Sequence, residues 1–98
     1  MREFLRGAVQ LHILHHAAKG EIYGAWMSRE LAGHGYDISP GTLYPTLHRL
    51  ESEGLLSSRA TVEEGRSRRV YKITPAGRKT LRRTRKALQE LADEVLGD

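Results

Sequence analysis

The sequence predicts a mainly α-helical protein with a small β-ribbon, and three observations support this class. Apolar residues recur at helical spacing in three blocks between residues 4 and 54, and the blocks are separated by glycines. Two β-rich segments then flank a charged stretch that contains glycine, and a long periodic segment closes the chain. The 98 residues suffice for one domain with a small core, to which a partner subunit could add.

The first two blocks predict two helices joined by a glycine. The first helix is expected from Phe4 to Ala18, where apolar residues recur every three or four positions, and Gly20 ends it. The second is expected from about Gly24 to Ala32. The sequence Gly33-His34-Gly35 supplies the turn that follows.

The third block predicts a short helix with clear start and stop signals. Ser39 is a good N-cap, and Pro40 after it loses no needed hydrogen bond. The apolar side must face a core and consists of Leu43, Leu47 and Leu50. Gly54 is placed to end the helix. Pro45 costs about 3 kcal/mol deep in a helix, so we expect a bent entry.

A two-stranded ribbon and a last helix complete the expected elements. The strands are predicted from Leu56 to Val62 and from Arg68 to Ile73, with a polar tip between them. Thr74 and Pro75 then provide an N-cap and a first helical position, and the helix should run to about Leu96. We therefore divide the chain into a domain over residues 1–74 and an arm over residues 75–98.

The arm carries the pattern of helices that pair with other helices. Five residues are spaced 3, 4, 3 and 4 apart, namely Leu81, Thr84, Leu88, Leu91 and Val95. The charges of the arm oppose the helix dipole, because basic residues fill its first half and acidic residues its second. We interpret the arm as a dimerisation helix, in which an antiparallel neighbour would match the charges. The alternative is a core helix within one chain.

Positive charge is concentrated in one part of the sequence. Residues 66–86 contain ten Lys and Arg residues and no acidic residue, whereas the rest of the chain has six basic and twelve acidic residues. Such segregation indicates a polyanionic partner. The alternative, which applies chiefly to the second half of this zone, is a solvated helix face.

Three helices followed by a ribbon are the order of a winged helix-turn-helix domain, whose third helix enters the DNA major groove. Off the leucine side, that helix presents Thr42, Tyr44, Pro45, Thr46, His48 and Arg49. Arg49 can bind guanine with two hydrogen bonds, whereas Arg66, Arg68, Arg69 and Lys72 on the ribbon would bind phosphates without regard to sequence. Alternatively, Tyr44 and His48 merely cover the core.

Three motifs of the chain resemble the PadR family of transcriptional regulators. They are Ser39-Pro40-Gly41-Thr42-Leu43-Tyr44-Pro45 with Leu50-Glu51-Ser52-Glu53-Gly54-Leu55-Leu56, then Ile22-Tyr23-Gly24, and then Arg69 to Arg78. The resemblance implies a homodimeric winged-helix protein that binds a pseudo-palindromic operator in double-stranded DNA, usually as a repressor of neighbouring genes that answers to an effector. The last helix would pack against the partner subunit. With the single terminal helix, the chain is similar to the short subgroup.

Taken together, residues and resemblance predict the following DNA-binding set: Tyr23, Ser39, Gly41, Thr42, Tyr44, Pro45, His48, Arg49, Arg66, Arg68, Arg69 and Lys72. Some short members of the family hold flat drugs between paired tryptophans on the last helix. The last helix here has no aromatic residue, so such a pocket is not expected.

A histidine cluster in the first helix suggests a metal-responsive regulator as an alternative. His12 and His16 share a helix face and can chelate a divalent metal, as can His12 and His15. Glu21 or a carboxylate of the partner subunit would have to complete the site. His34 and His48 are isolated in the sequence. The competing interpretation is that the three histidines are polar residues of a dimer interface.

The sequence contains no signature of an enzyme. It lacks cysteine, a phosphate-binding loop, a dinucleotide-binding glycine pattern and a Gly-x-Ser-x-Gly elbow. The N-terminal apolar residues are interrupted by polar ones, so we expect no signal peptide or membrane span and a cytoplasmic location. A winged-helix module that binds protein instead of DNA stays a minor alternative, because it would not need so many cations.

Overall fold

The computed structural model describes residues 1–97 and confirms a mainly helical fold with a small sheet. Its helices are α1 (Arg2–Lys19), α2 (Gly24–Gly33), α3 (Pro40–Ser52) and α4 (Pro75–Gly97). The strands are β1 (Ile22–Tyr23), β2 (Leu56–Glu63) and β3 (Arg66–Ile73). Asp98, the last residue of the expected arm, lies outside the described residues. Within residues 1–97, no helix is long and apolar enough to span a bilayer.

The sheet has one strand more than the sequence predicted. Its order is β1-β3-β2 with antiparallel pairing throughout, so Ile22–Tyr23 is an edge strand and not only the entry to α2. The ribbon is also tighter than expected, because Glu63 pairs directly with Arg66. Glu64 and Gly65 form the connecting turn with φ angles of 50° and 77°, the positive values that a two-residue hairpin turn requires.

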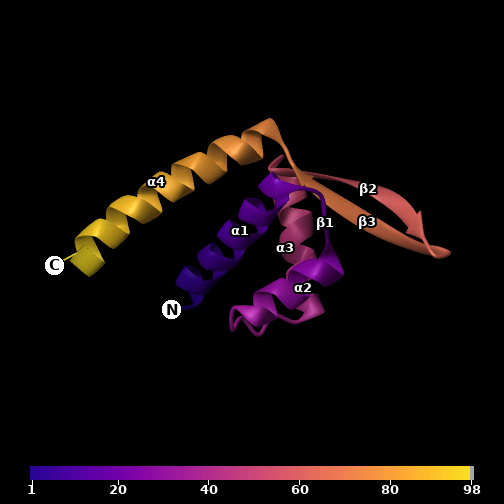
Figure 1. The fold of residues 1–98 in the computed structure, drawn as a ribbon, viewed down its shortest axis with the longest axis horizontal. Coiled ribbons are helices and arrows are strands. Elements are labelled where there is room, and N and C mark those ends of the chain that lie inside the picture. Colours follow the sequence, from indigo (N-terminus) through magenta and orange to yellow (C-terminus); the bar gives the residue numbers. More distant parts are fainter. Residues whose placement is uncertain (98) are drawn as a thin grey trace.

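The core lies between α1, α2, α3 and the base of the sheet (Figure 1). Its fully buried large side chains are Ile13, Leu14, Met27, Leu31, Leu43, Leu47, Leu50 and Leu56. The apolar side predicted for α3 is thus buried as expected. No polar residue of the described chain is buried, so the core depends on apolar packing alone.

The ends of α3 follow the sequence signals in part. The last turn closes as a Schellman motif, because Leu55 N–H donates to Leu50 O and Gly54 N–H to Glu51 O, with Gly54 at a φ of 79°. Ser39 occupies the N-cap position with an extended backbone, but its side chain makes no capping hydrogen bond. Its hydroxyl donates to Thr42 Oγ1 at 3.4 Å instead. Pro45 lies inside a continuous helix.

The start of α4 is fixed against the end of α3. Thr74 Oγ1 accepts a hydrogen bond from Gly77 N–H at 3.0 Å, which confirms Thr74 as a side-chain N-cap. Thr74 N–H donates to Leu55 O at 3.1 Å, and Gly77 packs on the same carbonyl so closely that a side chain there would overlap it. From this joint α4 runs away from the body of the domain, as does the ribbon in the opposite direction (Figure 1).

Candidate nucleic-acid interface

The outward side of α3 is small and nearly uncharged. Because residues in a helix are about 100° apart, the direction opposite the buried leucines falls on Gly41, Pro45, His48 and Ser52. All four are exposed. A surface with so few long side chains lets the helix backbone approach another macromolecule closely, and it offers His48 as its central polar group.

Tyr44 lies at the edge of this side and is half exposed, at 47%. Its ring covers Gly24, where an added Cβ would lie 2.5 Å from Tyr44 Cε1. The first residue of α2 must therefore be small to seat the ring. Tyr44 thus combines both interpretations, because part of its ring packs over Gly24 while about half of the side chain stays exposed.

Arg49 is on the side of α3 that faces α1, and its guanidinium already has partners. Nη1 donates to both carboxylate oxygens of Glu53, at 3.1 and 3.3 Å, and Nη2 donates to Gln10 Oε1 at 3.1 Å. These three hydrogen bonds within the chain therefore compete with a base for the donors of Arg49. The sequence did not indicate Gln10, which is 39 residues away.

The register of the ribbon divides the predicted wing cations between two faces, because directly paired residues share a face and neighbours alternate. Arg66, Arg68 and Lys72 share one face, on which Tyr23 of β1 also lies. Arg69 is on the opposite face, where it donates to Ser58 Oγ at 3.0 Å. Ser58 in turn donates to Glu51 of α3 at 2.5 Å. The wing thus carries a basic face and a face tied to α3.

On the basic face, Tyr23 and Arg68 meet at Glu63. The Tyr23 hydroxyl donates to Glu63 Oε1 at 3.0 Å, and Arg68 Nη1 is 3.9 Å from Glu63 Oε2. The guanidinium carbon of Arg68 is 5.6 Å from the centre of the Tyr23 ring. The hydrogen bond to Glu63 is the main reason that the pKa of Tyr23 is raised above its ordinary value. Tyr23 is half-buried, and Glu63 and Arg68 are exposed, so a ligand can reach all three residues.

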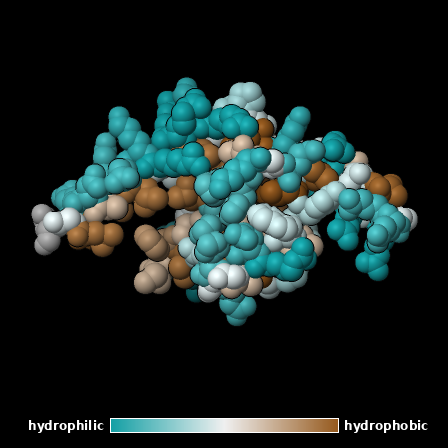
Figure 2. All heavy atoms as spheres, viewed as in Figure 1, coloured by the Kyte–Doolittle hydropathy of each residue, from teal (hydrophilic) through white to brown (hydrophobic). Residues whose placement is uncertain are grey.

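The arm α4 presents an uncovered apolar edge. Leu88, Leu91 and Val95 are 47%, 53% and 65% exposed, and Figure 2 shows apolar side chains along the edge of α4 that faces α1. The expectation for Leu81 needs correction. It is 2% exposed and packs in the chain's own core, because α4 begins on the sheet and α1 before it diverges.

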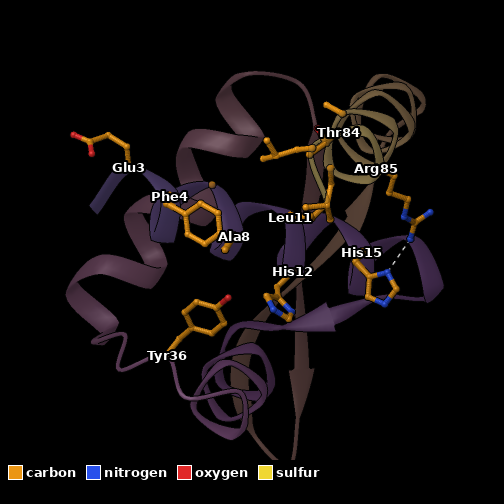
Figure 3. A pocket seen from close by; sticks show the side chains of 13 residues that line it. Glu3, Phe4, Ala8, Leu11, His12, His15, Tyr36, Thr84 and Arg85 are labelled. Atoms are coloured by element: carbon orange, nitrogen blue, oxygen red, sulfur yellow. Dashed lines mark hydrogen bonds between the residues drawn. The ribbon is translucent and has the colours of Figure 1, made fainter. Parts of the chain in front are cut away.

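A cavity of about 670 Å³ opens between α1 and α4 (Figure 3). Aromatic and apolar side chains dominate its lining, among them Phe4, Leu11, Tyr36, Leu88 and Leu91. Arg85 crosses its rim to hydrogen-bond His15 Nδ1 at 2.8 Å. This bond ties α4 to α1 at one end of an otherwise open apolar surface.

The histidines of α1 form a cluster with a histidine from outside that helix. Side-chain nitrogens of His12, His16 and His34 lie within 4.8 Å of one another. The sequence suggested that His34 is isolated, and the structure corrects this expectation. Glu30 Oε1 is 3.4 Å from His16 Nε2 and 3.2 Å from His34 Nε2. The turn after α2 causes this, because it folds His34 back over α1, where its ring centre is 4.8 Å from that of His12.

Glu21, one of the two carboxylates considered for a metal site, does not join this cluster. Its carboxylate binds Arg59 of β2 at 3.1 Å. Glu30 is a carboxylate near the histidines that we did not predict from the sequence. It lies on α2, four residues before His34, and this is the spacing at which side chains of a helix meet. Burial is the main cause that lowers the pKa of His12, followed by the charges of His34 and His16.

Three comparisons with known proteins agree with this geometry. Residues 13–83 match the sequence pattern of the Transcriptional regulator PadR-like family. The chain is 66% identical to Transcriptional regulator Rv3488 of Mycobacterium tuberculosis, over 99% of this chain and 91% of that protein. It is 32% identical to a transcriptional regulator of known structure from Clostridium thermocellum, with a TM-score of 0.82 over 97% and 95% of the two chains.

A further solved structure shares the fold at lower identity. Bacillus subtilis PadR in complex with operator DNA is 24% identical, with a TM-score of 0.69 over 76% of this chain and 45% of that one. The three-helix and ribbon arrangement is thus that of a regulator crystallised on DNA. The family is one of transcription regulators and not of enzymes. The chain belongs to the PadR-like family of transcriptional regulators.

Proposed function

We propose that this regulator is a cytoplasmic homodimer that represses neighbouring genes by binding a pseudo-palindromic operator. The observation that carries this proposal is the pairing, in one small domain, of the outward side of α3 with the basic wing face. The first has small residues and His48, and the second has Tyr23, Arg66, Arg68 and Lys72. The first suits a groove and the second suits phosphates.

The two parts would divide the work of binding. Arg49 would contribute to sequence selection after it exchanges Glu53 or Gln10 for a base, whereas Arg68 would bind backbone of any sequence. We therefore expect Arg49→Ala to weaken discrimination between operator and random duplex. Arg68→Ala should weaken both by a similar factor. Anisotropy titrations with both duplexes test this division, and equal loss of specific and non-specific affinity in both variants would contradict it.

A second copy of the chain is the occupant that we propose for the apolar edge of α4. Leu88, Leu91 and Val95 would pack against the partner, together with Thr84, and the cavity beside Phe4 would be closed by it. The charge pattern supports an antiparallel partner, because the basic first half of one arm would meet Glu90, Asp93 and Glu94 of the other.

The oligomeric state tests this directly. Leu91→Glu places a charge on the apolar edge, whereas Gln89→Glu adds the same charge to an exposed position about 160° around the helix from Leu91. Light scattering after gel filtration should show a dimer for the wild type and for Gln89→Glu, and a monomer for Leu91→Glu. A Leu91→Glu protein that stays dimeric would remove the proposed interface.

A second candidate function is a response to a divalent metal, and the cluster of three histidines, two of which contact one carboxylate, favours it. His12 and His16 of α1 would bind the ion, and His34 with Glu30 would complete a four-ligand site. Nitrogen ligands at about 2.0–2.1 Å from Zn²⁺ lie about 3.4 Å apart in a tetrahedral site. The 4.8 Å limit therefore requires only a small closure of the side chains.

The chemistry of the cluster agrees with such a role. Metals bind neutral imidazole, and burial, which lowers the pKa of His12, favours that neutral form. The cluster also joins α1 to α2 and to the turn that leads toward α3, so a bound ion would stiffen the helix-turn-helix unit. Any resulting change in DNA affinity must be matched by an equal change in metal affinity when DNA is bound.

Trp26 provides a local reporter, because it is the only tryptophan and its ring centre is 5.2 Å from that of His16. Titration with Zn²⁺, Cd²⁺ or Ni²⁺ should change its fluorescence in the wild type and in the control His48→Ala, whose histidine is on α3. The changes should disappear in His12→Ala/His16→Ala and weaken in His34→Ala. Unchanged binding in the double variant would remove the metal candidate.

A further inference from the structure

On the basic wing face, Glu63 is an acidic residue that holds two of the groups expected to bind DNA. It is the last residue of β2, and its carboxylate accepts the Tyr23 hydroxyl at 3.0 Å and lies 3.9 Å from the Arg68 guanidinium. The contact with Tyr23 links positions 40 residues apart. The neighbouring Glu64, by contrast, is in the turn and forms no ion pair or side-chain hydrogen bond within the described chain.

A carboxylate and a phosphate diester can bind the Tyr23 hydroxyl and the Arg68 guanidinium in the same way. Both offer anionic oxygens to a hydroxyl or a guanidinium, at similar distances. A phosphate that accepts the Tyr23 hydroxyl must therefore displace the Glu63 carboxylate, and a phosphate that binds Arg68 must tolerate the negative charge of Glu63 nearby. The same arrangement is found at Arg49 with Glu53 and at Arg59 with Glu21, at 3.1 Å each, so shielding of arginines by carboxylates recurs in this domain.

We propose that Glu63 is an affinity-setting residue that competes with DNA phosphate for Tyr23 and Arg68. This rests on the proposed DNA-binding function of the wing. Its consequence is a weaker hold on DNA backbone of any sequence, so that less of the protein is retained on random DNA. Non-specific binding is almost entirely electrostatic, so the competition acts on the whole of that affinity.

The substitution Glu63→Gln isolates the charge. The amide oxygen of glutamine still accepts the Tyr23 hydroxyl, and the residue is exposed, so the ribbon should keep its structure. Binding to a random duplex should tighten by up to about fivefold, the size of an exposed ion pair. Glu64→Gln changes the net charge equally but should tighten binding by less than about twofold, because salt screens a charge that has no cation partner.

Two further measurements separate competition from simple charge removal. The plot of log K against log salt should become steeper for Glu63→Gln by up to about 0.9, since Arg68 then neutralises a phosphate without releasing a carboxylate. In an Arg68→Ala background, most of the gain from Glu63→Gln should vanish. Gains that are equal for Glu63→Gln and Glu64→Gln, or that persist without Arg68, would overturn the proposal.

The titrations of the wild-type protein separate failure of the proposed role of Glu63 from failure of the proposed DNA binding by the wing. If the wild type binds the operator and the random duplex but the two Gln variants behave alike, only the role of Glu63 fails. If the wild type binds neither duplex at physiological salt, the proposed function of the wing fails as well.

Discussion

Gly77→Ala should destabilise the protein, although alanine normally favours a helix. The added Cβ would overlap the carbonyl oxygen of Leu55 and crowd Ile73 Cγ1, at 2.7 Å. The backbone cannot retreat freely, because that same carbonyl accepts a hydrogen bond from Thr74 N–H at 3.1 Å. Overpacking costs about 1–3 kcal/mol and a weakened hydrogen bond about 1 kcal/mol. The helical gain of alanine over glycine is about 1 kcal/mol. The net loss of unfolding free energy is therefore about 1–3 kcal/mol.

Urea denaturation at one fixed protein concentration measures this loss, since a dimer's stability depends on concentration. Gly33→Ala is the matched control, because Gly33 is also helical and a Cβ added there would meet no atom within 4 Å. The control should be neutral or stabilised by up to about 1 kcal/mol. A Gly77→Ala protein as stable as Gly33→Ala would refute the claim that the joint between α3 and α4 is closed by backbone contact.

Three other predictions concern the interface, the histidines and the cap of α4. Gly24→Ala should change stability by less than about 1 kcal/mol, because the Tyr44 ring can swing away. It should nevertheless weaken operator binding several-fold in an anisotropy titration, because the ring leaves its position. Unaltered operator binding would show that the position of the Tyr44 ring does not affect binding. In metal-free buffer, the unfolding free energy should fall as the pH drops through about 6.5. The unfolded chain, in which His12 has its ordinary pKa of about 6.5, then takes up protons that the folded chain with its lowered pKa does not. Denaturation series at about pH 7.5 and 5.5, on either side of that pKa, should show a smaller fall of the unfolding free energy for His12→Gln than for the wild type. An equal fall in both proteins would show that His12 does not cause the pH dependence. Thr74→Ala should destabilise α4 by about 1 kcal/mol in urea denaturation, through loss of its bond to Gly77 N–H; no loss would show that this cap contributes nothing.

Local sequence signals were sufficient for most of the fold. The leucine side of α3, the glycine that ends it and the Thr74 cap each depend on neighbours in sequence, and the structure confirms all three. The edge strand at Ile22–Tyr23 was missed because two residues are too few to show an alternating pattern. Its pairing with β3 is set by tertiary packing.

The candidate site was less predictable, because its decisive contacts join distant segments. Gln10 meets Arg49 across 39 residues, Tyr23 meets Glu63 across 40, and His34 reaches His12 only through the turn after α2. Residue type indicated which side chains have the chemistry to bind anions or metals. It could not indicate which of them already have partners within the chain.

The central claim is that this regulator recognises a particular DNA sequence, and one measurement tests it most directly. The wild-type protein is titrated, at physiological salt, into a labelled duplex from its own promoter region with an excess of random competitor DNA. Sequence-specific regulators bind their sites roughly 10³–10⁷ times more tightly than random DNA. We expect a saturable complex that the competitor does not remove. A complex lost to competitor as readily as one on a random duplex would contradict the claim.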